Sequence, residues 1–150
     1  MMAPLSRYFT LEEMTKTDTG FINVPNQQEL ENLSDLCADV LDKVRILCGP
    51  IIVSSGYRSS EVNSFVGGAR GSQHLYGMAA DIQSRKLTPK ELFQRIMDAD
   101  IQYDQLILEF DRWVHISYNG LLNRQMALHA TIQNGNVVYV SIEGSKQKWM

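Results

Sequence analysis

Several hallmarks of common protein classes are missing from this sequence of 150 residues. No segment approaches the run of about 18 apolar residues that a membrane-spanning helix requires. The N-terminal stretch MMAPLSRYFTLEEM has neither the basic start nor the apolar core of a signal peptide. We therefore expect a chain that does not insert into membranes and needs outside help to cross one.

An excess of positive charge is also missing. The 14 Lys and Arg residues are outnumbered by 17 Asp and Glu residues, which gives a formal net charge of -3. The basic residues are scattered rather than gathered into a stripe that could follow a phosphate backbone. The composition therefore argues against a nucleic-acid partner.

Cysteine is scarce, with two examples, Cys37 and Cys48. Both lie in what the pattern predicts to be one helix, and a straight helix would separate them by about 16 Å. This distance is far too long for a disulfide bond. We expect two buried thiols, which fit synthesis in a reducing compartment.

What the sequence does contain is typical of a globular domain, with 44% hydrophobic and 21% charged residues. The length suits one domain of ordinary size. No internal repeat, low-complexity tract or linker divides the chain. We predict a single domain over residues 1–150.

Helix signals dominate the earlier part of the chain. Thr10 and Glu13 have the spacing of a capping box. After Pro25, apolar residues recur at three- and four-residue intervals up to Gly49, which predicts a long amphipathic helix. The segment LTPKELFQRIMDAD begins a further helix with its own capping box and a proline at the first helical position.

Strand signals dominate the later part. The run PIIVSS predicts a buried strand, and YDQLILEFDRWVHIS predicts two strands around a polar centre. An Asn-Gly turn predicts a C-terminal hairpin over about residues 126–143. Together the elements predict an α+β fold in which helices pack on a small, mainly antiparallel sheet.

Two of the three histidines have sequence neighbours that suggest a metal site. His74 precedes Asp81 by seven positions in GSQHLYGMAADI, where small residues allow a tight turn and close packing. Imidazole and carboxylate are good zinc ligands, and His115 in the strand WVHIS would complete a three-ligand site with one open position. The spacing by itself is a weak pattern, and a turn into a core strand explains the first motif equally well.

The alternation of side chains along a strand limits which residues can contact one another. Side chains two positions apart in a strand share a face, so His115 shares its face with Trp113. If the preceding strand forms a hairpin around FDR, Glu109 reaches the same side as His115. A carboxylate beside a metal-activated water is a candidate general base.

Other residues allow two interpretations each. Arg58 in SSGYRSS is either a solvated loop residue or a cation that binds a substrate carboxylate or polarises a carbonyl. His129 has no carboxylate close to it in sequence, and we interpret it as structural. Trp113 and Tyr57 could line a cleft, although aromatic residues beside strands more often serve packing.

The segments SSGYRSSEVNSFVGGARGSQHLYGMAADI and YDQLILEFDRWVHIS resemble the zinc D-alanyl-D-alanine carboxypeptidase family. These peptidoglycan peptidases share a fold with the vancomycin-resistance dipeptidases and the Hedgehog signalling domain. The resemblance covers about residues 8–118. Its specific elements are an S-x-H motif followed after six residues by D, a later W-x-H on a strand, and an upstream Y-R.

The resemblance implies that His74, Asp81 and His115 are ligands of one Zn²⁺ per chain. Arg58 matches the arginine that holds or polarises the substrate in the family. Ser72 and Gln73, beside the first ligand, would support it or contact substrate.

The catalytic carboxylate departs from the family pattern. Many relatives place Glu or Asp three residues before the last histidine, and Arg112 stands there in this chain. An arginine side chain cannot accept a proton. Glu109 is therefore our first choice as general base, and Asp111 in the presumed turn is the second.

The function implied is a zinc-dependent peptidase that hydrolyses a bond in peptidoglycan stem peptides or cross-links, as a carboxypeptidase or an endopeptidase. The alternative is a non-catalytic, zinc-containing module that binds cell-wall peptides, which the arginine at the usual base position favours. The resemblance also suggests a phage endolysin, made in the host cytoplasm and delivered through a holin or a particle. We expect a monomer.

Overall fold

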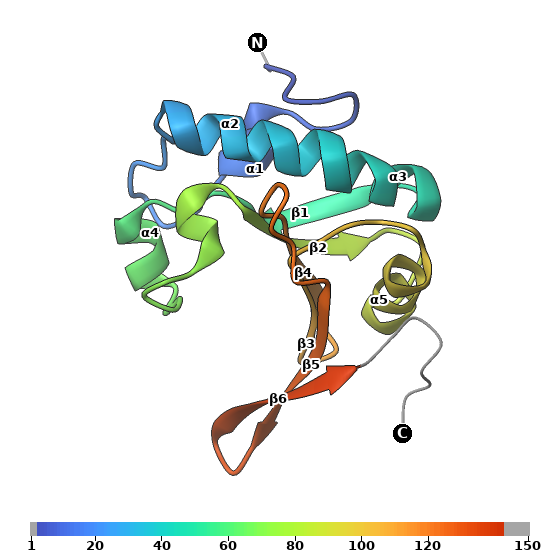
Figure 1. Ribbon diagram of the computed structural model, residues 1–150. Coiled ribbons are helices and arrows are strands. Elements are labelled where there is room, and N and C mark those ends of the chain that lie inside the picture. Colours follow the sequence, from blue (N-terminus) through green and yellow to red (C-terminus); the bar gives the residue numbers. More distant parts are fainter. Residues whose placement is uncertain (1–2, 143–150) are drawn as a thin grey trace.

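The computed structural model describes residues 3–142, and its centre is a six-stranded sheet (Figure 1). The strand order is β1-β2-β4-β3-β5-β6. Neighbouring strands run antiparallel except β3 and β5, which are parallel. The predicted α+β class with a mainly antiparallel sheet is confirmed. In chain order the strands are β1 (Ile51–Ser55), β2 (Ala79–Ser84), β3 (Gln105–Glu109), β4 (Trp113–Ser117), β5 (Met126–Gln133) and β6 (Asn136–Ile142).

Two helices begin at the capping residues that the sequence predicted. α1 (Leu11–Thr15) follows the capping box of Thr10, and α5 (Pro89–Asp98) follows that of Thr88. Two short elements, α4 (Ser60–Phe65) and the 3-10 helix η2 (Gln73–Tyr76), lie between β1 and β2 in the chain. The side chains of Thr10 and Thr88 each accept a hydrogen bond from a backbone N–H that the first helical turn leaves free.

The predicted long helix is continuous but not regular. It consists of α2 (Gln27–Leu36), a π-helical turn η1 (Cys37–Leu41) and α3 (Asp42–Cys48). Figure 1 shows α2 and α3 running along one side of the sheet above β1. Both cysteines of this helix are free and buried, as expected.

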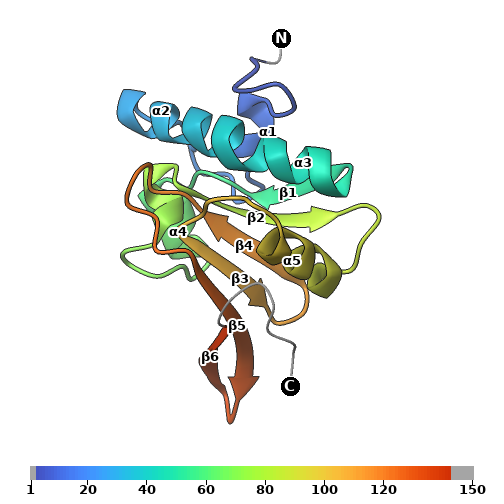
Figure 2. The same cartoon turned by 45° about the vertical axis from the view of Figure 1, so that its right-hand side comes forward.

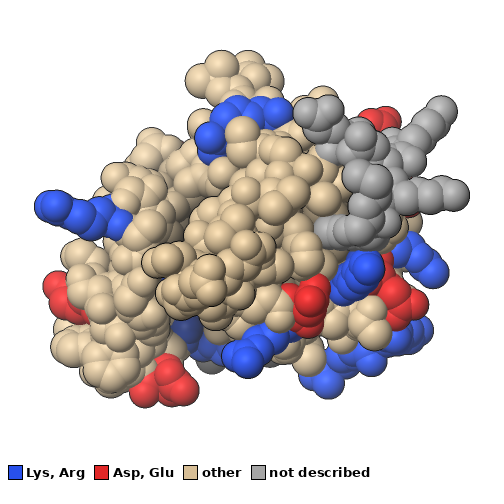
Figure 3. Space-filling view, turned by 90° about the horizontal axis from the view of Figure 1, so that it is seen from below, with Lys and Arg blue, Asp and Glu red and all other residues tan. Residues whose placement is uncertain are grey.

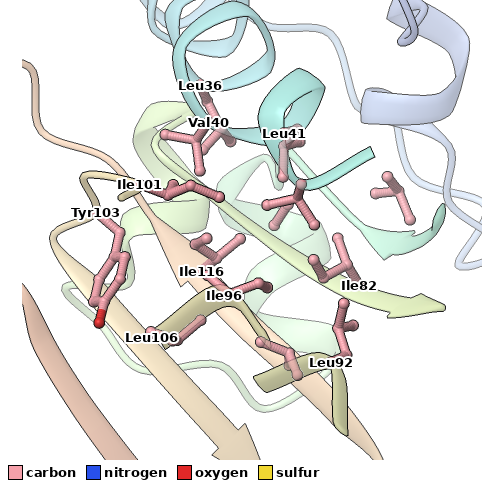
Figure 4. Close-up of a cluster of buried hydrophobic side chains, with 14 of the residues drawn as sticks. Leu36, Val40, Leu41, Ile82, Leu92, Ile96, Ile101, Tyr103, Leu106 and Ile116 are labelled. Carbon is pink, nitrogen blue, oxygen red and sulfur yellow. The ribbon is translucent and has the colours of Figure 1, made fainter. Parts of the chain in front are cut away.

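The hydrophobic core lies between these helices and one face of the sheet. Figure 4 shows the side chains that meet there. They come from the long helix (Leu36, Val40 and Leu41), from α5 (Leu92 and Ile96) and from the strands (Ile82, Leu106 and Ile116). All of them are fully buried. Burial of these large aliphatic side chains is the main contribution to the free energy that holds the helices against this face of the sheet.

The alternation of side chains along the strands leaves polar groups on the opposite face. On β2, Ala80 and Ile82 are buried in the core, so Asp81 between them points away from it. On β4, Val114 and Ile116 are in the core, and His115 between them points the same way as Asp81. The face opposite the helices is therefore the polar face of the central strands.

The last two strands form the predicted hairpin. Asn134 and Gly135 connect them with positive φ angles of 52° and 79°, as a two-residue hairpin turn of this type requires. The hairpin projects from the rest of the sheet (Figure 2). Position 143, the predicted end of the hairpin, lies outside the described residues.

Figure 3 shows one face of the surface with its charged side chains. Lys and Arg occupy several separate places on this face, with Asp and Glu among them. Within residues 3–142, no helix has both the length and the apolar character that crossing a membrane would take.

Candidate metal centre

Three predicted ligands converge on the polar face of the sheet. Asp81 and His115 are directly paired across β2 and β4, so their side chains stand next to each other. His74 is brought to the same place by η2, which precedes β2. All three residues are buried, with exposed fractions of 2% for His74, 6% for Asp81 and 9% for His115.

The distances between the ligand atoms fit a tetrahedral metal site. Oδ1 of Asp81 lies 3.3 Å from Nε2 of His74 and 3.0 Å from Nδ1 of His115. The three ligand atoms all lie within 4.8 Å of one another. Two ligands at about 2.0 Å from a tetrahedral zinc ion would be roughly 3.3 Å apart. The nitrogen, nitrogen and oxygen donors therefore fit zinc in both type and spacing.

A hydrogen bond orients His74 towards this centre. Its Nδ1 lies 2.7 Å from the carbonyl oxygen of Gly56. Since a carbonyl only accepts, Nδ1 must donate, and the lone pair of Nε2 is left to face Asp81. Gly56 lies so close to the Met14 carbonyl that a Cβ would collide with it. The glycine thus lets the chain approach near enough to hold the histidine.

Glycine also permits the turn from η2 into β2. Ser72 caps η2 by accepting a hydrogen bond from the backbone N–H of His74. Gly77 ends the helix in the left-handed conformation, with φ of +74°, which L-residues with a side chain avoid. A Cβ at this position would also collide with the carbonyl oxygen of Glu29. Gly77 is therefore required on steric grounds at this turn.

The ionisation of the ligands suits metal binding. Burial raises the pKa of Asp81, but the interactions of the carboxylate with His115 and His74 outweigh this effect and hold the pKa well below the usual range. Burial lowers the pKa of His74 by more than the neighbouring Asp81 raises it. An ionised carboxylate and a neutral imidazole are the forms that bind metal ions.

Arg58 lies against the ligands rather than in open solvent. Its Nη2 donates to Oδ2 of Asp81 at 3.2 Å. Its Nε and Nη1 donate to Ser55 and Asn63, at 2.9 and 3.2 Å. The side chain is 14% exposed. The arginine therefore holds the second carboxylate oxygen of Asp81 while still lining the cleft described below.

Glu109 reaches the ligands from the neighbouring strand. Its Oε1 lies 3.7 Å from Nδ1 of His115. Burial raises the pKa of Glu109, and the charge of Asp81 raises it further, against the opposing effects of His115 and Arg58. Glu109 therefore lies beside the candidate ligand His115 as a half-buried carboxylate with a raised pKa.

The turn between β3 and β4 places the other candidates elsewhere. Asp111 has φ of 56°, and its exposed carboxylate lies 3.2 Å from Nε2 of His129. Neither residue lines the cleft that contains the three ligands. The arginine at position 112 is exposed and does not line the cleft. This arrangement supports Glu109 over Asp111 as the base.

The ligands lie in a cleft of about 760 Å³. Besides Arg58 and Glu109, its lining includes Ser72, Gln73 and Trp113. Tyr57 is 6% exposed and belongs to the core. Of the two aromatic residues considered from sequence, Trp113 therefore lines the cleft and Tyr57 packs inside.

Two charged residues of the cleft were not singled out from the sequence. Asp104 and Arg124 line it together with the ligands, and Asp104 also accepts a hydrogen bond from Gln73. The three residues are distant in the chain. Gln73 lies in the S-x-H motif and Asp104 in the segment YDQLILEFDRWVHIS, but Arg124 belongs to neither. Only the fold brings them together.

Comparison with known proteins agrees with this geometry. A segment of 33 residues, 22% of this chain, is 58% identical to a zinc D-Ala-D-Ala carboxypeptidase of Streptomyces albus G. The match spans 13% of the length of that protein. The model of the family described as Peptidase M15 matches residues 7–117. This range contains α1 to β4 and the three candidate ligands, and the chain therefore belongs to the Peptidase M15 family.

Proposed function

We propose that this chain is a zinc-dependent peptidase that hydrolyses a peptide bond in peptidoglycan stem peptides or cross-links. The observation that carries the proposal is the buried triad of His74, Asp81 and His115 with the Glu109 carboxylate beside it. Family membership supports a peptidase, and the named activity of the Streptomyces relative supports zinc and the substrate class.

The triad would hold one Zn²⁺ per chain. Three protein ligands leave a fourth tetrahedral position open, which is typical of catalytic rather than structural zinc sites. A zinc ion bound there supplies two effects, a lowered pKa for the attacking water and polarisation of the scissile carbonyl.

Glu109 would act as general base and then as general acid. It would accept the proton of the attacking water and pass it to the leaving amine. Its raised pKa favours this task, since a base with a pKa nearer to neutrality also donates more readily in the second step.

Arg58 would anchor a substrate carboxylate or stabilise the developing oxyanion. Its three hydrogen bonds use one N–H from each nitrogen, so within residues 3–142 two of its five N–H groups remain for a substrate. Ser72 and Gln73 line the same cleft and would support His74 or contact the peptide.

Digestion of purified peptidoglycan tests the proposal. Wild-type protein loaded with zinc should release amino groups. A chelator should abolish the release, and Glu109→Gln should strongly reduce its rate. Identification of the released amino groups then names the bond. Co-sedimentation with the wall without any released amine would contradict the enzyme and support the non-catalytic, zinc-containing binding module instead.

A further inference from the structure

A buried carboxylate outside the metal centre lines the same cleft. Asp104 is 1% exposed and precedes β3. Its Oδ2 accepts a hydrogen bond from Nε2 of Gln73 at 2.9 Å, and Gln73 is the residue before the ligand His74. Asp104 is thus connected to the metal centre through a single neighbouring residue.

The same carboxylate fixes the position of Arg124. Nε and Nη2 of Arg124 donate to the two oxygens of Asp104 at 2.9 and 2.7 Å, and its backbone N–H donates to Oδ1 at 2.9 Å. Two parallel bonds between a guanidinium and a carboxylate define the plane of the guanidinium. The side chain is nevertheless 53% exposed.

The backbone around Arg124 is held as firmly. Gln125 has φ of 53°, and its side chain accepts from the N–H of Tyr103 and donates to the carbonyl of Ile101. The N–H of Met126 donates to the carbonyl of Asp104. The loop before β5 is therefore tied to the segment before β3, and Arg124 is pre-organised in the cleft.

Arg124 differs from Arg58 in what it leaves for a ligand. Asp104 occupies the Nε and Nη2 edge of Arg124. Within residues 3–142 the other edge, with Nη1 and the second N–H of Nη2, keeps three N–H groups for a ligand. This edge is the planar fork that binds a carboxylate with two hydrogen bonds.

We propose that Arg124 is a specificity-determining residue that binds a free carboxylate of the substrate peptide, held in position by Asp104. The proposal rests on the proposed function in so far as the ligand is a stem peptide. Residue 124 lies beyond the segment 7–117 that the family model matches, whereas its partner Asp104 lies within that segment.

Binding measurements with matched peptides test the proposal. The probes are a stem-peptide fragment with free carboxylates and versions in which the C-terminal carboxylate or the α-carboxylate of the isoglutamyl residue is amidated. Titration calorimetry with zinc-loaded protein in the Glu109→Gln background gives affinities without cleavage. We expect one amidation to weaken binding at least tenfold with Arg124 present and less than twofold with Arg124→Gln. The amidation that shows this difference identifies the carboxylate.

Three further variants keep the test decisive. Arg124→Lys should retain part of the preference, because it keeps the charge and loses the fork. Arg112→Gln removes one exposed positive charge next to the cleft residue Trp113 and should leave the preference intact. Asp104→Asn should reduce the preference with Arg124 still present, since the guanidinium is no longer oriented.

Two results would overturn the proposal. One is an unchanged ratio between acid and amide affinities in Arg124→Gln, and the other is an equal loss of affinity for every peptide. Zinc content of Arg124→Gln should match that of the background protein. Its thermal unfolding should stay cooperative, with only the small loss of stability that the missing ion pair with Asp104 implies, which separates loss of recognition from loss of structure. Absence of cleavage by the wild type would contradict the proposed function but leave the acid-to-amide ratio to judge this subsite.

Discussion

Glu109 lies 3.7 Å from His115 although the two residues sit on different strands and are not directly paired. Across β3 and β4, His115 pairs with Ile107, and Glu109 pairs with Trp113. Glu109 and His115 are therefore diagonal neighbours on one face, close enough for long side chains to meet. Arg112 stands three residues before His115 in this chain, and we propose that Glu109 on the adjacent strand supplies the catalytic carboxylate.

Replacement of this carboxylate should separate catalysis from metal binding. We expect Glu109→Gln to keep one zinc per chain and to lower kcat by about 10²- to 10⁴-fold, the usual contribution of a general base. Metal analysis and the rate of amine release give the two quantities.

Asp111→Asn is the matched control for Glu109→Gln. Asp111 forms its contact with His129 outside the cleft, so its loss should change kcat by less than about threefold. A near-normal kcat in Glu109→Gln together with a large loss in Asp111→Asn would reverse the assignment of the base.

Removal of a ligand should reduce metal content and activity together. His74→Ala and His115→Ala each leave two protein ligands and should retain well below one zinc per chain after dialysis against buffer. His129→Ala removes a histidine that does not line the cleft and should retain zinc fully. Full zinc content in either ligand variant would refute the site.

The turn into β2 should tolerate no side chain. Gly77→Ala places a Cβ at φ of +74° and against the Glu29 carbonyl, and we expect it to lower the free energy of unfolding by more than about 3 kcal/mol. Gly120 also has a positive φ, +55°, but no atom within 4 Å of an added Cβ. Gly120→Ala should therefore cost only about 1–2 kcal/mol, and urea unfolding measures both. Equal costs would mean that the Glu29 contact is unimportant.

The ion pair of Asp104 and Arg124 should stabilise the fold above acidic pH. The hydrogen bonds from Arg124 lower the pKa of Asp104 from 3.8 to about 2. Because the folded state holds this proton more weakly than the unfolded state, the contribution is complete above about pH 4 and is lost as the pH falls towards 2. Its size is about 1–2 kcal/mol, since solvent screens the half-exposed arginine.

Urea unfolding of metal-free protein between pH 3 and pH 6 measures this contribution. The stability difference between wild type and Asp104→Asn should shrink as the pH is lowered. Arg124→Gln should show the same trend, and the double variant should lose little more than either single variant. A difference that stays constant over this pH range would contradict the assignment.

Much of the secondary structure could be predicted from local sequence signals. The capping boxes at Thr10 and Thr88 marked where helices begin, because side chain and backbone satisfy each other over three residues. The π-helical turn Cys37–Leu41 was not predicted, because apolar residues at three- and four-residue intervals suit a regular helix as well as a locally widened one.

The sequence by itself determined the ligand types, the turn that small residues allow between His74 and Asp81, and the strand alternation that puts Glu109 and His115 on one face. These properties depend on neighbouring residues and on a two-residue period, which are readable locally. The tertiary structure alone decided that the carbonyl of Gly56 orients His74 and that Asp104 joins Gln73 to Arg124. Such contacts join residues that are far apart in the chain. The sequence contains many other donors and acceptors of the same types, and only the packing of the folded chain determines which of them meet.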